Sequence, residues 1–184
     1  MITTIKITES AKSDARIYAN KIIEKGITDP NHPSGVNGGT IFDRYYYGYL
    51  GEWGFNEFLS INKIKDSIKW DREADGLADK GDFFFGGKII DVKNASKECY
   101  TRLMIPLVQF ERCKKDYYVG TKMLSKYFKD DYIEIMGYAL SEDIRQAQVG
   151  DFGIGSTKWI YHSNLKDIKG LVNQDILKKW EDKE

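Results

Sequence analysis

The tightest constraint on the fold of this chain is a glycine pair between two β-prone runs. Residues 82–94 read DFFFGGKIIDVKN, and the GG dipeptide at 86–87 is a strong signal for a two-residue β-hairpin turn. Such a turn fixes the pairing register of both strands. Asp82 is then expected directly opposite Asp91, with Cβ atoms about 4.5–5.5 Å apart. The sequence therefore predicts an apolar hairpin with two acids at its open end.

Two like charges held opposite one another are destabilising unless something neutralises them. Lys93 lies two residues beyond Asp91 and projects from the same strand face, because strand side chains alternate. Three remedies are open. One carboxyl group keeps its proton through a raised pKa, Lys93 offsets part of the repulsion, or a divalent cation binds between the acids. The third explains most, because both acids supply the oxygen ligands that Mg²⁺ prefers and Lys93 is left to face an anion.

The rest of the chain predicts a mixed α/β fold. Apolar periodicity and capping residues predict helices over residues 10–25, 41–61, 106–115, 141–148 and 172–180. Runs rich in β-branched and aromatic residues predict further strands over 67–70, 116–123, 131–140 and 157–162. The segment 29–40 holds all but one of the prolines and is expected to be a loop. This order favours a central mixed β-sheet flanked by helices.

We expect a single domain over residues 1–184, because no repeat, linker or low-complexity tract interrupts the chain. An N-terminal helix and loop occupy 1–40, the core about 41–140, and a C-terminal strand and helix 141–184. The helix over 41–61 carries too many aromatic residues for an exposed helix, so a broad face should be buried. Gly51 and Gly54 each cost a helix about 1 kcal/mol relative to alanine, which indicates close approach of neighbouring backbone.

Composition excludes several classes of protein. The 28 basic residues balance the 28 acidic ones, which argues against a protein that coats nucleic acid by bulk charge attraction. Two cysteines and two histidines show neither zinc-site spacing nor a disulfide framework. The N-terminus lacks the features of a signal peptide, and no apolar stretch approaches membrane-spanning length. We therefore expect a soluble, cytoplasmic protein without a membrane partner.

The pattern D-x8-D-x-K on a β-hairpin, after a helix that contains GEWGFNEFL, resembles the PD-(D/E)XK nuclease superfamily. That superfamily includes restriction endonucleases and Holliday-junction resolvases. Asp82 matches the acid that opens the second core strand, and Asp91, Val92 and Lys93 match the D/E-x-K triplet. The resemblance covers about residues 41–140 and implies a restriction-endonuclease-like core.

The helix glutamate that often completes the metal site in this superfamily is matched by Glu52. Glu57, five residues further on, points away from Glu52 on an ideal helix and is the weaker match. Gly81 stands where the superfamily's name pattern has proline. Three alternatives stay open: the hairpin's polar residues line a solvated face, Glu52 is an ordinary surface residue, or Asp79 replaces Asp82 as a ligand.

The resemblance implies a metal-dependent DNA endonuclease that hydrolyses phosphodiester bonds. Asp82, Asp91, the Val92 carbonyl and Glu52 would hold Mg²⁺, for which Mn²⁺ should substitute. The ion would polarise a phosphate oxygen and lower the pKa of a bound water. Lys93 would orient or help to deprotonate that water and offset charge developing at phosphorus. The alternatives are a catalytically inactive DNA-binding or assembly module on a nuclease fold, and a metal-free structural protein.

Residues 97–129 carry eight basic against three acidic residues and form the expected DNA-binding region. Phosphate contacts from such a region make binding strongly dependent on salt. The candidate contacts are Lys97, Arg102, Arg112, Lys114 and Lys115, with Lys122, Lys126 and Lys129 further along. A small nuclease that cuts both strands would act as a homodimer. Neither the DNA structure nor the sequence that it recognises follows from these residues.

Overall fold

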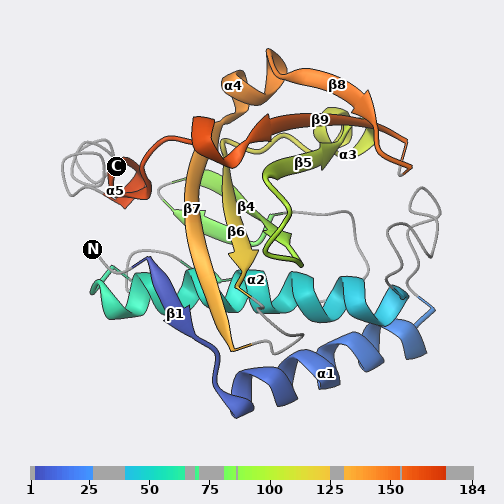
Figure 1. Ribbon diagram of the computed structural model, residues 1–184, viewed down its shortest axis with the longest axis vertical. Helices are drawn as coiled ribbons and strands as arrows, with labels where there is room; N and C mark the ends of the chain where they lie inside the picture. The colour runs from blue at the N-terminus through green and yellow to red at the C-terminus, as the bar shows by residue number, and fades with distance from the viewer. Residues whose placement is uncertain are drawn as a thin grey trace.

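The computed structural model describes residues 3–26, 40–64, 69–70, 81–85, 87–124, 131–153 and 155–172. Two long helices lie side by side along one side of a six-stranded β-sheet, and a small three-stranded sheet lies on the other side (Figure 1). Helices and a mixed sheet are combined as the sequence predicted, so the mixed α/β class is confirmed. No helix in these ranges is long and apolar enough to cross a membrane.

The two long helices are α1 (Glu9–Glu24) and α2 (Ile41–Ile61). Thr8 caps α1 by accepting the Ala11 N–H, so the helix begins earlier than Ser10, the predicted cap. Thr40 and Asp43 cap α2 reciprocally: each side chain accepts a hydrogen bond from the backbone N–H of the other residue. The bounds of α2 are those predicted, and its buried aromatic residues confirm the broad buried face.

The large sheet mixes parallel and antiparallel pairs. Its strands, in spatial order, are β1 (Thr4–Lys6), β7 (Tyr132–Leu140), β6 (Tyr117–Met123), β4 (Lys88–Ala95), β3 (Phe83–Phe85) and β2 (Lys69–Trp70). Only the neighbours β4 and β6 run parallel; the other pairs of this sheet are antiparallel. A short helix, α3 (Leu107–Arg112), lies in the crossover between the parallel strands.

The hairpin register follows the prediction. Phe85 pairs with Lys88 and Phe83 with Ile90, as a two-residue glycine turn requires. The ladder ends there, so Asp82 lies one residue before β3 rather than in a strand pair. Its backbone N–H donates to the Ile90 carbonyl over 3.0 Å, which holds it beside β4.

Two glycines let α2 approach the sheet closely. A Cβ atom on Gly51 would lie 2.6 Å from the Asn94 Cβ, and one on Gly54 would lie 2.7 Å from the Ile133 Cγ2. The predicted close approach is confirmed, although the contacts are with side chains of β4 and β7 rather than with backbone. Asn94 Nδ2 also donates to the Tyr47 carbonyl over 2.9 Å. The middle of α2 is thereby fixed against β4, the strand that carries the D-x-K triplet.

The small sheet is antiparallel and contains two strands that the sequence did not predict. Its order is β5 (Arg102–Pro106), β9 (Ser156–Tyr161) and β8 (Gln148–Asp151). It packs against the large sheet through a second apolar cluster that consists of Leu103, Ile105, Tyr118, Ala139 and Ile144. The strands β5, β8 and β1 escaped prediction because they are short and lack a clear apolar alternation. The small sheet brings β5 next to the end of β4.

The remaining elements are shorter than predicted. Pro106 ends β5 and precedes α3, which stops at Arg112 instead of 115. The helix predicted over 141–148 is α4 (Ser141–Arg145), followed directly by β8. The chain continues through a 3-10 turn, η3 (His162–Asn164), to α5 (Ile168–Val172). The predicted loop over 29–39, the connection over 71–80 and most of the helix over 172–180 lie outside the described residues.

Candidate active site

Four predicted site residues lie within electrostatic reach of one another around β3 and β4, inside the large sheet. Glu52 comes from α2, Asp82 from the start of β3, and Asp91 and Lys93 from β4. Burial raises the pKa of Asp82 well above its ordinary range, and the negative charges of Glu52 and Asp91 raise it further. The Lys93 ammonium and the Val92 N–H act in the opposite direction. The Asp82 carboxyl group therefore interacts electrostatically with those of Glu52 and Asp91.

Asp91 and Lys93 form an ion pair. The Lys93 Nζ lies 2.7 Å from the Asp91 Oδ2, so the two side chains project from one face, as strand alternation predicted. Asp91 is only 1% exposed, whereas the Lys93 side chain is 22% exposed. Lys93 was expected to face an incoming anion, but here its ammonium balances Asp91. The ion pair is the second of the three predicted ways to offset the repulsion, and the raised pKa of Asp82 is in the direction that the first requires.

Asp82 is held by backbone on both sides. Its N–H donates to the Ile90 carbonyl, and its Oδ2 accepts the Val92 N–H over 2.6 Å. A carboxylate that accepts a backbone N–H is fixed in orientation, and this bond also favours its ionised form. The partly buried side chain therefore reaches from the residue before β3 to Val92, the middle residue of the D-x-K triplet.

Glu52 is oriented by a residue that the sequence analysis placed only in a strand. The Trp70 Nε1–H donates to the Glu52 Oε2 over 3.0 Å. The Trp70 ring stacks on Phe83 with centroids 5.7 Å apart and planes 12° from parallel. The edge strand β2 thus carries a donor that aims the helix glutamate. An indole at the end of a two-residue strand gives no local sign of this role.

Tyr18 is a second residue that sequence reasoning missed. It lies on α1 and packs against Tyr49 of α2, with ring centroids 5.2 Å apart. Burial raises the pKa of its phenol, and the charges of Glu52 and Asp82 raise it further. The hydroxyl therefore stays protonated and keeps its hydrogen while lying within electrostatic reach of two site carboxylates. Nothing in its sequence neighbourhood distinguishes it from the other residues of α1.

The carboxylates of the site are suitable ligands for a hard divalent cation, but their present positions are not those of a metal site. Three carboxylates face one ammonium, and carboxylate oxygens are the ligands that Mg²⁺ prefers. Among the described residues, no group of three His, Cys, Asp or Glu side chains is close enough to hold a metal ion as it stands. Asp79, the alternative ligand, lies outside the described ranges. A cation would therefore need rotation of side chains that now bond to Val92, Lys93 and Trp70.

A pocket of about 300 Å³ opens beside Lys93. It lies between the end of β4 with the following turn and strand β5, and Cys99, Tyr100 and Arg102 contribute to its wall. Lys93 thus contacts both the site and the pocket, since it pairs with Asp91 and also lines the pocket wall. If a substrate atom lay next to Lys93, the neighbouring part of the substrate would occupy the pocket.

The predicted DNA-contacting residues divide into three groups. Lys97 is exposed beside the pocket and Arg102 lines it. Arg112 and Lys114 are exposed at and after the end of α3. Lys115 is only 2% exposed, with its Nζ near Gly81, so it offers no surface to a phosphate. We therefore remove Lys115 from the candidate interface.

Comparisons of the chain with protein-family models, with curated proteins and with solved structures found no match. The resemblance to the PD-(D/E)XK superfamily therefore stays a prediction from the sequence. The function has to be inferred from the chemistry of the side chains and their arrangement.

Proposed function

We propose that this protein is a metal-dependent endonuclease with a restriction-endonuclease-like core that hydrolyses phosphodiester bonds of DNA. The observation that carries the proposal is that Glu52, Asp91 and Lys93 all act electrostatically on Asp82, beside strands β3 and β4. Three acids and a lysine, next to a pocket, match the needs of phosphoryl chemistry, because the reaction develops negative charge and requires an activated water.

The metal would be Mg²⁺, with Mn²⁺ as a substitute. Its ligands would be the carboxylates of Asp82, Asp91 and Glu52 together with the Val92 carbonyl. When bound, the ion would supply Lewis-acid polarisation of a phosphate oxygen and lower the pKa of a water molecule. The interactions among the carboxyl groups, which raise the pKa of Asp82, support this assignment because a cation would relieve them.

Residues of the chain would orient the water, offset developing charge and position the ligands. Lys93 is the more exposed partner of its ion pair and also lines the pocket, so it can turn from Asp91 to a phosphate once the Asp91 charge is balanced otherwise. There it would orient the attacking water and offset the charge that develops on the phosphoryl oxygens. Trp70 would keep Glu52 aimed at the site.

DNA would lie along the side of the molecule that holds the pocket. Arg102 lines the pocket and Lys97 is exposed beside it, and we propose that the exposed Arg112 and Lys114 add further phosphate contacts. Contacts from these residues to phosphates would make binding weaken steeply with added salt. Cleavage of both strands at one position would require a second copy of the chain, which we propose acts as a homodimer.

The test is cleavage of plasmid, linear duplex, single-stranded and four-way-junction DNA with Mg²⁺, Mn²⁺ or EDTA. We expect cutting that depends on the metal and is lost in Asp91→Ala and Lys93→Ala. The matched controls are Glu142→Ala and Lys88→Ala, which break ion pairs away from the site and should cut like the wild type. Equal cutting by wild type and Asp91→Ala would overturn the proposal.

A second candidate is a catalytically inactive DNA-binding module on a nuclease fold. The ion pair between Asp91 and Lys93 would serve this candidate as well, because it balances the buried Asp91 charge within the protein itself. Folded wild-type protein that binds DNA tightly but cuts none of the four substrates would establish this candidate.

A further inference from the structure

We propose that the pocket beside Lys93 holds one unpaired nucleotide of the substrate strand, next to the phosphate that is cleaved. The substrate class would then be DNA with an unpaired stretch rather than intact duplex. This inference rests on the proposed nuclease function and specifies its substrate. It is carried by the charge and the size of the pocket and by the aromatic rings packed around Arg102, which lines the pocket.

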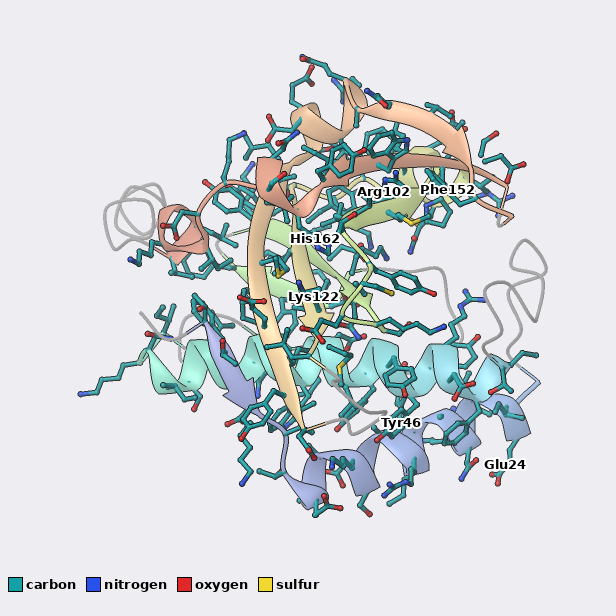
Figure 2. All side chains as sticks on the ribbon, in the orientation of Figure 1. Glu24, Tyr46, Arg102, Lys122, Phe152 and His162 are labelled. Atoms are coloured by element: carbon teal, nitrogen blue, oxygen red, sulfur yellow. The ribbon has the colours of Figure 1, made fainter. Side chains whose placement is uncertain are left out.

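The pocket contains a positive charge that no acid neutralises among the described residues. Arg102 lines its wall, and its Nε is buried without a hydrogen-bond partner. Its guanidinium is surrounded by rings instead of carboxylates, with the Trp159 centroid at 4.7 Å and those of Phe152 and Tyr161 at 5.3 Å. Figure 2 shows Arg102 of β5 beside Phe152, the residue that follows β8. An unneutralised guanidinium of this kind attracts a phosphate or the polar edge of a base.

The register of the small sheet gathers these groups on one face. Arg102 pairs with Tyr161, and Met104, two residues along β5, pairs with Trp159. Because strand side chains alternate, all four project from the same side. Arg102 and Met104 line the pocket together with Tyr100, whereas Trp159 and Tyr161 do not, so the aromatic face borders the pocket through Arg102 and Met104. Bases of single strands stack on aromatic rings and on arginine planes, whereas the bases of a duplex are already stacked on one another.

The size of the pocket points to a single nucleotide. Its volume of about 300 Å³ is at the lower end of the range for pockets that hold small ligands, about 300–1,000 Å³. A base can enter such a pocket only after it has left its partner and its stack, which costs least where the strand is already unpaired. Lys93 in the pocket wall places the phosphate of the bound nucleotide next to the candidate catalytic site.

Cys99 provides a direct test, because it is an exposed thiol that lines the pocket. We would measure its alkylation by N-ethylmaleimide at peptide resolution, with saturating single-stranded dT15 or with dT15 paired to dA15. The half-buried Cys113, which is not part of the pocket wall, serves as the internal control. The measurement would be made on the wild type in EDTA and on Asp91→Asn in Mg²⁺, because neither is expected to cut the strand. The wild-type arm gives a result even if the Asp91→Asn variant does not fold.

We expect single-stranded DNA to slow Cys99 alkylation at least five-fold, duplex to slow it less than two-fold, and Cys113 to be unaffected. Arg102→Met should weaken single-strand binding about ten-fold, whereas Arg145→Met, which changes an exposed arginine on α4, should not. Equal protection of Cys99 by duplex, or protection by neither DNA, would overturn the inference. If wild type cuts duplex while Cys99 stays unprotected, only this inference fails. If Cys99 is protected but no DNA is cut, the pocket is supported and the nuclease function fails.

Discussion

The Lys93 Nζ and the Asp91 Oδ2 lie 2.7 Å apart, and of the two side chains only that of Lys93 reaches solvent to an appreciable degree. Lys93→Ala should therefore lower the single-turnover cleavage rate at saturating Mg²⁺ by about 10²–10⁴-fold, the range typical of a lost acid–base group. The loss of rate should far exceed any loss of folding, because bound metal would balance Asp91.

Lys88→Ala is the matched control for Lys93→Ala. Lys88 lies on the same strand and forms a comparable ion pair, 3.0 Å from Asp116, away from the site. Its removal should change the cleavage rate less than two-fold. Near-wild-type cleavage by Lys93→Ala at saturating metal would show that Lys93 has no catalytic role.

Trp70→Phe should weaken cleavage by removing the hydrogen bond that orients Glu52. A hydrogen bond to a charged group contributes about 1.5–3 kcal/mol, which corresponds to a rate change of about ten-fold or more. The phenyl ring can still stack on Phe83, so the thermal midpoint should move little. Glu52→Gln should cost more than Trp70→Phe, and Glu57→Gln on the same helix should cost nothing. Rates measured against Mg²⁺ concentration check this, and a fully active Trp70→Phe enzyme would refute the positioning role.

The pH dependence of stability in EDTA should report on Asp82. Its pKa is raised in the folded protein by burial, Glu52 and Asp91, whereas the unfolded chain has the ordinary value of about 3.9. The folded state therefore binds the extra proton, and the stability from this group is complete below about pH 3.9 and is lost as the pH rises through the raised pKa. Asp82→Asn should be more stable than wild type at neutral pH.

Urea unfolding of both proteins from pH 4 to 9 measures this difference directly, because other titrating groups cancel. The asparagine can still accept the Val92 N–H, so the comparison isolates the charge. Asp14→Asn, which changes an exposed acid on α1, should follow the wild-type curve. A wild-type minus Asp82→Asn difference that does not change with pH would contradict the raised pKa.

Substitution by alanine should have opposite effects on stability at two glycines of α2, Gly51 and Gly48. Gly51→Ala would place a Cβ 2.6 Å from the Asn94 Cβ, and overpacking of this kind costs about 1–3 kcal/mol. Gly48 has no atom within 4 Å of its ideal Cβ, so Gly48→Ala should instead stabilise the helix by about 0.5–1 kcal/mol. Chemical denaturation tests both, and a stabilised Gly51→Ala variant would show that α2 does not depend on this close approach.

The local chemistry of the chain was enough to predict its hairpin and its longest helix. The glycine turn set the register of β3 and β4, and the capped aromatic run set the bounds of α2. The short strands β1, β5 and β8 were missed because each is defined by its partner strand rather than by its own pattern. The helix ends at 115 and 148 were overestimated, since the chain must turn into β6 of the large sheet after α3 and into β8 of the small sheet after α4.

The hairpin spacing predicted that Asp82, Asp91 and Lys93 lie near one another, whereas Glu52 was predicted only from the family resemblance. The roles of Trp70, Tyr18 and the rings around Arg102 were not predicted, since each depends on contacts between residues far apart in the sequence. The burial of Lys115 illustrates the same limit: a basic run does not reveal which of its members faces inward.

Divalent-cation binding by Glu52, Asp82 and Asp91 is the property on which the proposed hydrolysis depends. Calorimetric titration of the wild type with Mn²⁺ should show one saturable binding event per site, weakened at least ten-fold in Asp91→Asn. Glu142→Gln, which changes an exposed glutamate on α4, should bind like the wild type. Absence of binding heat in the folded wild type, or equal affinity in Asp91→Asn, would contradict a metal-dependent nuclease at this site.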